Sequence, residues 1–170
     1  MDVTRRDGQY PVTLTVNGRR AAAYVGSDET LLAVLRRVFG LTSCRESCGV
    51  GLCGTCTVSL DGQVVSSCIM LARLADGAEV ETVEVVGAPG GLSDLQAAFV
   101  AEGALQCGFC TPGMIMMSRQ LLRENPDPSP AQVAEYLAGN ICRCGSYPEI
   151  IRAVRRCAQD RAAAGRSETG

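Results

Sequence analysis

Eight of the ten cysteines in this 170-residue chain fall into two groups of four. The first quartet consists of Cys48, Cys53, Cys56 and Cys68. Its C-x4-C-x2-C run, followed by a distant fourth cysteine, is the spacing by which plant-type ferredoxins hold a [2Fe–2S] cluster. Glycines between the ligands let the backbone approach the cluster sulfurs and adopt positive φ, namely Gly49, Gly51 and Gly54. This loop therefore predicts a centre for one-electron chemistry.

The second quartet consists of Cys107, Cys110, Cys142 and Cys144, a C-x2-C pair followed by a distant C-x-C pair. Zinc is often held by four cysteines in two C-x2-C pairs, and C-x2-C also occurs in iron–sulfur sites. A structural zinc site therefore stays open for the second quartet, whereas the first quartet has poor spacing for zinc. Taken together, the two quartets predict a small protein that moves single electrons between two clusters.

The remaining two cysteines, Cys44 and Cys157, do not fit either ligand pattern. The spacing from Cys44 to Cys48 is C-x3-C, which does not match the plant-type ferredoxin register. A free cysteine packs like a small hydrophobic residue, so we expect both to be packing or surface residues. We likewise expect Met114, Met116 and Met117 to fill a core rather than to bind a metal.

The composition excludes several classes of function. The chain has no histidine, which rules out Cys–His nucleophiles, Ser–His–Asp triads and zinc or Rieske sites with histidine ligands. The net charge is −2 and no basic face is evident, so we expect no nucleic-acid partner. No apolar run approaches the roughly 18 residues that indicate a membrane span.

The N-terminal sequence MDVTRRDGQY has no apolar segment of the kind found in secretory signals. Arg5 and Arg6 form an isolated pair without a following apolar run, so we do not interpret them as an export signal. Dense cysteine in a reducing compartment indicates metal or redox chemistry rather than disulfides. We therefore expect a cytoplasmic protein.

A hairpin and a helix are predicted ahead of the first cysteine loop. Residues 10–25 alternate apolar and polar side chains around an Asn-Gly pair at 17–18, the strongest short hairpin signal. An amphipathic helix follows, which Ser27 or Asp28 can cap and Gly40 can end.

Beyond this helix, the sequence predicts a loop, a second hairpin and a further strand. The loop covers residues 44–56, the hairpin covers 56–67 with its turn at Asp61–Gly62, a short helix covers 69–75 and a strand covers 79–86. This order suits a small sheet packed on one helix.

The pattern changes after the Gly- and Pro-containing connector at residues 86–91, beyond which only helices are predicted. Capping signals mark four helix starts, at Ser93 with Gln96, Thr111 with Pro112, Ser129 with Pro130 and Gln132, and Ser146 with Glu149. The first, second and fourth of these helices are expected to end near residues 103, 124 and 164. The tail at 165–170 is expected to be disordered.

Four segments carry a family resemblance over residues 10 to 157, nearly the whole chain. They are ESCGVGLCGTCTV, SSCIMLA, LQCGFCTPGMIM and GNICRCGSYPEI. They resemble the iron–sulfur subunit or domain of the molybdenum hydroxylases, the family of xanthine dehydrogenase, aldehyde oxidoreductase and carbon monoxide dehydrogenase. One departure is at the second C-x-C, where the family often has C-R-C-T-G-Y and this chain has C-R-C-G-S-Y. Both thiols remain.

The resemblance implies an α+β fold with two domains. A plant-ferredoxin-like β-grasp domain is expected at residues 8–86, and a four-helix [2Fe–2S]-binding domain at 92–164. It also implies that both clusters are [2Fe–2S]. Gln106 matches a family position that contacts the pterin cofactor, and Cys144 matches the ligand that approaches the pterin.

The function implied by the resemblance is electron transfer within an oxidoreductase complex. A large catalytic subunit would hold molybdopterin, and a medium subunit would hold FAD. Electrons would pass from the molybdopterin centre through the second cluster and then the first to FAD or another acceptor. We expect no substrate turnover from this chain alone. The alternative is a freestanding ferredoxin-like carrier, against which the second cluster argues, since one cluster suffices for shuttling.

Overall fold

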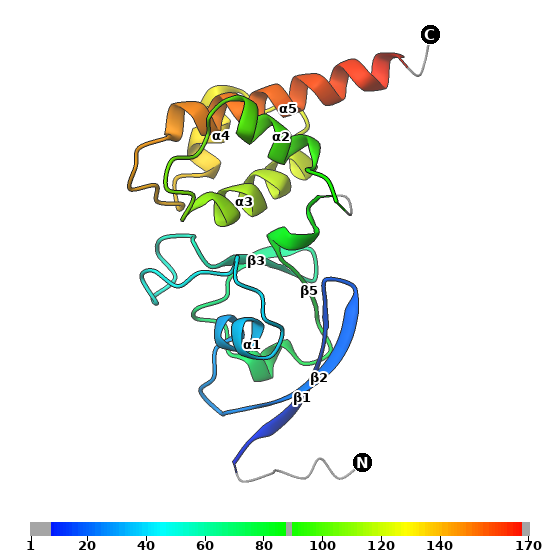
Figure 1. Ribbon diagram of the computed structural model, residues 1–170, viewed down its shortest axis with the longest axis vertical. Helices are drawn as coiled ribbons and strands as arrows, with labels where there is room; N and C mark the ends of the chain where they lie inside the picture. The colour runs from blue at the N-terminus through cyan, green and yellow to red at the C-terminus, as the bar shows by residue number, and fades with distance from the viewer. Residues whose placement is uncertain (1–7, 88–89, 168–170) are drawn as a thin grey trace.

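In the computed structural model, which describes residues 8–87 and 90–167, the first half of the chain is a five-stranded mixed sheet packed on one helix (Figure 1). The strands are β1 (Tyr10–Val16), β2 (Arg19–Val25), β3 (Thr57–Leu60), β4 (Gln63–Ser66) and β5 (Glu79–Glu81), in the spatial order β2-β1-β5-β3-β4. β1 and β5 are parallel and the other neighbours are antiparallel. This α+β arrangement confirms the predicted sheet and helix.

Both predicted hairpins are present. Asn17 and Gly18 have φ of 52° and 75°, and Asp61 and Gly62 have φ of 49° and 82°. Two consecutive residues at positive φ form the type I′ turn, whose twist matches that of the flanking strands. The alternation along β1 buries every second side chain from position 12 to 16, which fixes the register against β2.

Helix α1 (Leu31–Arg37) covers the sheet with four buried aliphatic side chains. Its cap is Thr30, whose side chain accepts a hydrogen bond from the Ala33 amide, so the prediction of Ser27 or Asp28 as the cap was wrong. The reason lies in the tertiary structure, because Thr30 forms an isolated antiparallel bridge with Leu71. That pairing keeps the chain extended up to residue 30.

The prediction of a strand over residues 79–86 was correct at its start and wrong after residue 81. β5 ends at Glu81, and a 3-10 helix, η2 (Val83–Val85), follows it. Thr82 breaks the strand because its amide donates to the side-chain oxygen of Asn17 at 2.9 Å instead of continuing the ladder. The predicted short helix at 69–75 is also a 3-10 helix, η1 (Ala72–Ala75).

The second half of the described chain is helical, as predicted. Its helices are α2 (Asp94–Ala101), α3 (Thr111–Glu124), α4 (Pro130–Tyr136) and α5 (Tyr147–Ser167). Ser93 and Ser129 form the predicted capping boxes. Phe99, Met114 and Ile150 are among the residues that pack the core between these helices. Residues 88–89 of the connector lie outside the described part.

Three details of the helix ends differ from the sequence predictions. α3 is capped by the backbone of Cys110 rather than by Thr111, which is already helical. The capping box expected at Ser146 does not form, since its hydroxyl has no hydrogen-bond partner within the described residues. α5 continues to Ser167, past the end predicted near residue 164, and residues 168–170 of the tail lie outside the described part.

The two halves meet where α3 lies over β3 (Figure 1). A Cβ atom at Gly113 would lie 2.1 Å from the carbonyl oxygen of Gly54, so only glycine lets the helix approach the cysteine loop this closely. Arg119 on α3 adds a salt bridge to Glu81 on β5, with a nitrogen–oxygen distance of 3.0 Å. We refer to this contact region as the seam. No helix within the described residues is long and apolar enough to cross a membrane.

Candidate iron–sulfur sites

The first quartet is brought together by the loop before β3 and by the end of the β3–β4 hairpin. Cys48, Cys53 and Cys56 lie on the loop, and Cys68 follows β4. The thiols contact one another in two pairs, Cys48 with Cys53 and Cys56 with Cys68. A [2Fe–2S] cluster held by four cysteines needs two thiolates on each iron. The pairing therefore provides one pair of donors for each of two irons.

Backbone amides in this loop point at the thiol sulfurs. The amides of Val50 and Leu52 lie 3.5 and 3.4 Å from the Cys48 sulfur. Gly49 and Gly51, at φ of 67° and 76°, permit the curvature that aims them. The amide of Val50 is the largest of the causes that lower the pKa of the Cys48 thiol to about 6. These hydrogen bonds favour the thiolate, which is the form that binds iron.

Cys68 has the opposite environment. Burial raises the pKa of its thiol to about 11, with a further contribution from the neighbouring Cys56 thiol. Metal binding must therefore displace a proton from this side chain. The first quartet thus combines one donor that ionises readily with one that the metal itself must ionise.

The second quartet joins the loop before α3 to the loop before α5. The sulfurs of Cys107 and Cys144 lie 3.4 Å apart, and the thiol of Cys110 contacts that of Cys142. The pairwise pattern of the first quartet is thus repeated. Cys107 is exposed and Cys144 is half-buried, so one pair lies at the molecular surface.

The second quartet also has amides directed at a sulfur. Burial acts to raise the pKa of the Cys142 thiol, but hydrogen bonds that include those from the backbone of Ser146, Cys144 and Gly145 outweigh it and lower the pKa. Gly145 has φ of 80°, which the tight turn after the C-x-C pair requires. In this chain the turn has G-S where the family usually has T-G, and the backbone of both Gly145 and Ser146 contributes to this lowering.

The donor chemistry fits a two-iron cluster better than zinc at both quartets. Four-coordinate zinc needs four ligands directed at one point. Two pairs of thiols with amides aimed at the sulfurs are instead what a [2Fe–2S] cluster requires.

The two other cysteines lie within the two cores. Cys44 is 3% exposed in the core of the sheet, and Cys157 is 1% exposed in the core of the helices. Burial raises the pKa of each thiol to about 12, so both stay protonated. They pack as small hydrophobic residues. Met114 and Met116 are buried as well.

Three hydrogen bonds join the first cysteine loop to the two loops of the second quartet across the seam. The amide of Ile141 donates to the carbonyl of Cys53 at 3.0 Å, and the side-chain amide of Asn140 donates to the carbonyl of Gly54 at 3.2 Å. Arg45 donates to the carbonyl of Gly108 at 2.5 Å. The sequence analysis missed Asn140 and Arg45. Asn140 is part of the GNICRC segment, whereas nothing in the sequence distinguishes Arg45.

Gln106, proposed from the family resemblance as a pterin contact, lies at the exposed edge of the second quartet. Its side-chain nitrogen is 3.5 Å from the carbonyl oxygen of Cys144, at the limit of a hydrogen bond. The two residues that the resemblance relates to the pterin are therefore adjacent in the structure. Leu105, Phe109 and Ile141 expose apolar side chains in the same loops.

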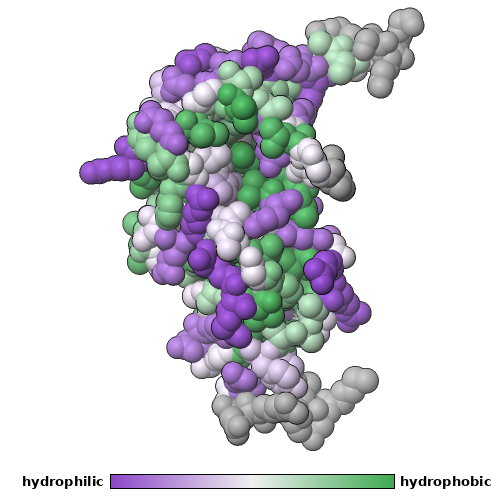
Figure 2. Space-filling view, viewed as in Figure 1, coloured by the Kyte–Doolittle hydropathy of each residue, from purple (hydrophilic) through white to green (hydrophobic). Residues whose placement is uncertain are grey.

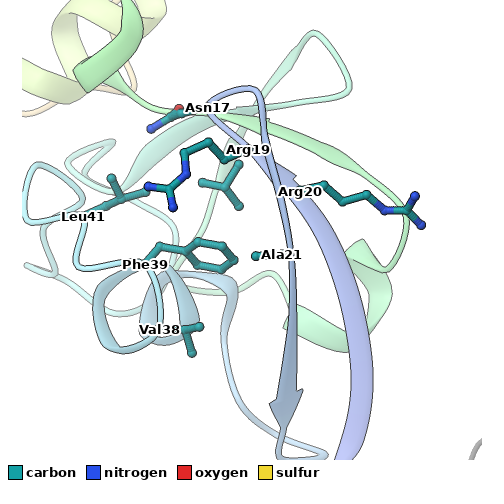
Figure 3. A pocket seen from close by; sticks show the side chains of 8 residues that line it. Asn17, Arg19, Arg20, Ala21, Val38, Phe39 and Leu41 are labelled. Atoms are coloured by element: carbon teal, nitrogen blue, oxygen red, sulfur yellow. The ribbon is translucent and has the colours of Figure 1, made fainter.

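Two cavities show where other groups can approach. One of about 360 Å³ is lined by thiols of both quartets, including Cys53 and Cys107. Another of about 280 Å³ lies beside the β1–β2 hairpin, where Arg19 extends toward Phe39 and Leu41 (Figure 3). No cysteine lines the second cavity, so it does not belong to the candidate sites.

Known families and proteins match both halves of the chain. The family described as 2Fe-2S iron-sulfur cluster binding domain matches residues 14–89, and the family described as [2Fe-2S] binding domain matches residues 82–155. The nicotinate dehydrogenase small FeS subunit of Eubacterium barkeri is 44% identical over 151 residues, which cover 86% of this chain and 96% of that subunit.

Two further similarities extend over most of the chain. The nicotine 6-hydroxylase small subunit of Paenarthrobacter nicotinovorans is 46% identical over 143 residues, covering 84% of this chain and 86% of that subunit. The crystal structure of quinoline 2-oxidoreductase from Pseudomonas putida 86 contains a chain with a TM-score of 0.87 and 41% identity, covering 90% of this chain and 96% of that one.

Proposed function

The chain belongs to the family of two-cluster iron–sulfur subunits of the molybdenum hydroxylases, and we propose that its eight paired cysteines carry electrons from a molybdopterin centre to FAD or another acceptor. The observation that supports this function most directly is the division of each quartet into two contacting pairs of thiols. When bound, the clusters supply reversible one-electron chemistry.

We propose the following ligands for the two clusters. Cys48, Cys53, Cys56 and Cys68 hold one cluster, and Cys107, Cys110, Cys142 and Cys144 hold the other. Amides such as that of Val50 stabilise the charge on the bound thiolates. The protein's own part is thus to fix the position and the electrostatic environment of the two clusters.

The seam provides a short connection between the two sets of ligands. The carbonyl of Cys53 accepts the hydrogen bond from the amide of Ile141, and Ile141 directly precedes Cys142. One hydrogen bond therefore links a proposed ligand of the first cluster to the residue adjacent to a proposed ligand of the second. Asn140 holds this contact in register through its own hydrogen bond to Gly54.

We further propose a large molybdopterin-binding subunit and a medium FAD-binding subunit as partners, and the cytoplasm as the compartment. The exposed edge at Gln106 and Cys144 faces the pterin in this proposal. The domains are taken as residues 8–86 and 92–164. The substrate is a small heterocycle, purine or aldehyde, and its choice belongs to the large subunit. The three relatives described above are named for nicotinate, nicotine and quinoline, which are nitrogen heterocycles, and others are named aldehyde oxidoreductase.

The test is purification of the native complex with cofactor analysis. We expect about four iron atoms and four acid-labile sulfides for each copy of this chain, since two [2Fe–2S] clusters contain that many. Two distinguishable EPR signals should appear on reduction, and molybdenum and flavin should co-elute. Two zinc ions without sulfide would refute the cluster assignment. Elution of the cluster-loaded chain alone would favour the freestanding carrier.

A further inference from the structure

Arg45 is a cation on the first cysteine loop that is held by groups of the loop before α3. It lies three residues before Cys48, in the first half of the chain, yet its guanidinium donates to the carbonyl of Gly108 at 2.5 Å. The guanidinium carbon also lies 5.4 Å from the centre of the Phe109 ring, within the range of a cation–π contact. Among the described residues, Arg45 forms no salt bridge with a carboxylate.

The contact with Gly108 leads directly to a proposed cluster ligand. The peptide unit between Gly108 and Phe109 accepts the Arg45 hydrogen bond at its carbonyl, and its amide is the largest of the causes that lower the pKa of the Cys107 thiol. A cation at the carbonyl end of a peptide polarises that peptide and strengthens the hydrogen bond made by its N–H group. Arg45 is thus connected to the Cys107 sulfur through a single peptide group.

We propose that Arg45 is a positioning residue that raises the reduction potential of the second cluster by acting on Cys107 from the other half of the chain. This inference rests on the proposed function. Reduction adds negative charge to the cluster, so a fixed cation and a stronger amide hydrogen bond both favour the reduced form. Arg45 therefore makes the second cluster a better electron acceptor only while the two halves are docked.

The test is an EPR-monitored redox titration of the purified complex carrying Arg45→Met, Arg45→Gln or Arg45→Lys. Iron and sulfide analysis first checks that both clusters are present. The signal that Cys53→Ser disturbs is assigned to the first cluster, and the other signal to the second. We expect Arg45→Met to shift the midpoint potential of the second cluster in the negative direction by more than that of the first.

The other two variants separate the effect of the Arg45 charge on the midpoint potential from the effect of its hydrogen bond. Arg45→Lys keeps the cation and should lie closer to the unaltered protein than Arg45→Gln, which keeps an amide donor without charge. This comparison also decides the matter if Arg45→Met does not assemble the second cluster. Equal midpoint potentials for the Lys and Gln variants would overturn the proposal.

Arg119→Met is the matched control for loosening of the seam. Arg119 also crosses the seam, but its partner is Glu81 and not a peptide of a cysteine loop. We expect this control to leave the second midpoint potential unchanged. An equal shift in both Arg→Met variants would mean that Arg45 only holds the halves together, and the proposal would fail. The presence of two cluster signals in every case keeps this result separate from the proposed function itself.

Discussion

Individual cysteines in this protein differ in how strongly their surroundings favour the ionised thiol. The amide of Val50 helps to lower the pKa of Cys48 to about 6, while burial raises the pKa of Cys44 to about 12. The two side chains are only four positions apart. Burial also raises the pKa of two proposed ligands, Cys68 to about 11 and Cys110 to about 12, so thiol pKa alone does not separate ligands from packing cysteines. The spacing in the sequence does separate them.

The spacing of the cysteines predicts different outcomes for their substitution. Cys53→Ser should lose or badly disturb the first cluster, because a hydroxyl is a poor substitute for a soft thiolate. Cys44→Ser and Cys157→Ala should keep both clusters, with at most a loss of stability from the altered cores. Iron content and the EPR spectrum of the reduced protein provide the measurement. Loss of the first cluster in Cys44→Ser, together with its retention in Cys48→Ser, would show that the ligand assignment of the loop is wrong.

At the residue scale, spacing in the sequence was enough to propose all eight ligands, because a cluster imposes a strict pattern on its thiols. The sequence did not identify Arg45. Its role depends on a carbonyl 63 positions away, at Gly108, and on the ring of Phe109. Such a contact is set by how the two halves dock, and no local pattern records it.

The elements follow the sequence where their signals are local and depart from it where tertiary contacts decide. The capping boxes at Ser93 and Ser129 form as predicted because each is completed within four residues. The cap of α1 moves to Thr30 because Leu71 pairs with Thr30 in an antiparallel bridge. β5 stops at Glu81 because the side chain of Asn17 accepts the hydrogen bond of the next amide, that of Thr82. These partners are distant in sequence, so propensity alone could not place the boundaries.

The approach of α3 to the first cysteine loop predicts the effect of a single methyl group. Gly113→Ala would place its Cβ 2.1 Å from the Gly54 carbonyl oxygen, so the helix must move away from the seam. We expect the free energy of unfolding to fall by about 1–3 kcal/mol, the usual cost of overpacking. Denaturant unfolding followed by the visible absorbance of the clusters measures this change.

Gly139→Ala is the matched control for this prediction. Gly139 lies in the same half of the chain, but a Cβ there meets no atom within 4 Å. Its substitution should change the free energy of unfolding by no more than about 0.5 kcal/mol. Equal effects at the two glycines would contradict the close contact between α3 and Gly54.

A second prediction for the elements concerns the acid side of the stability profile. The hydrogen bond from Arg161 on α5 to Asp94, in the first turn of α2, is the main cause that lowers the pKa of this carboxyl. A group whose pKa is lower in the folded state stabilises the fold above its unfolded pKa of about 4. That contribution is lost as the pH falls through the lower folded value.

Asp94→Asn should therefore reduce the free energy of unfolding at neutral pH by about 0.2–1 kcal/mol, as is usual for an exposed ion pair. The difference from the unaltered protein should shrink in acid, and unfolding measured at several pH values checks this. The control is Asp160→Asn, whose carboxylate lies 3.8 Å from Arg156 and is 69% exposed, so little change is expected. A constant difference for Asp94→Asn at all pH values would show that ionisation of Asp94 contributes nothing.

For the whole molecule, the two proposed cluster sites differ in their access to partners. Cys53, Cys56 and Cys68 of the first quartet are buried, whereas Cys107 is exposed and Cys144 is half-buried. Apolar residues are exposed around the middle of the molecule, between more hydrophilic ends (Figure 2). The second site thus offers an open edge on which a cofactor held by another subunit can lie. The motifs predicted both halves of the molecule. The seam that orients this edge joins residues of different motifs, so no single motif records its contacts.

The last prediction concerns this exposed edge and its partner. Gln106→Ala should leave both clusters bound, because the amide is not an iron ligand and its contact with the Cys144 carbonyl, at 3.5 Å, is weak. In the complex it should weaken the contact with the pterin or slow the reduction of the clusters by substrate. The loss of one ordinary hydrogen bond is worth about 0.5–1.5 kcal/mol, so a moderate effect is expected. Pre-steady-state reduction and pterin retention provide the measurements, with Gln159→Ala on α5 as a control at another exposed glutamine of the helical half. If Gln106→Ala changes neither quantity, Gln106 is not part of the pterin site, although the electron-transfer role of the chain would remain.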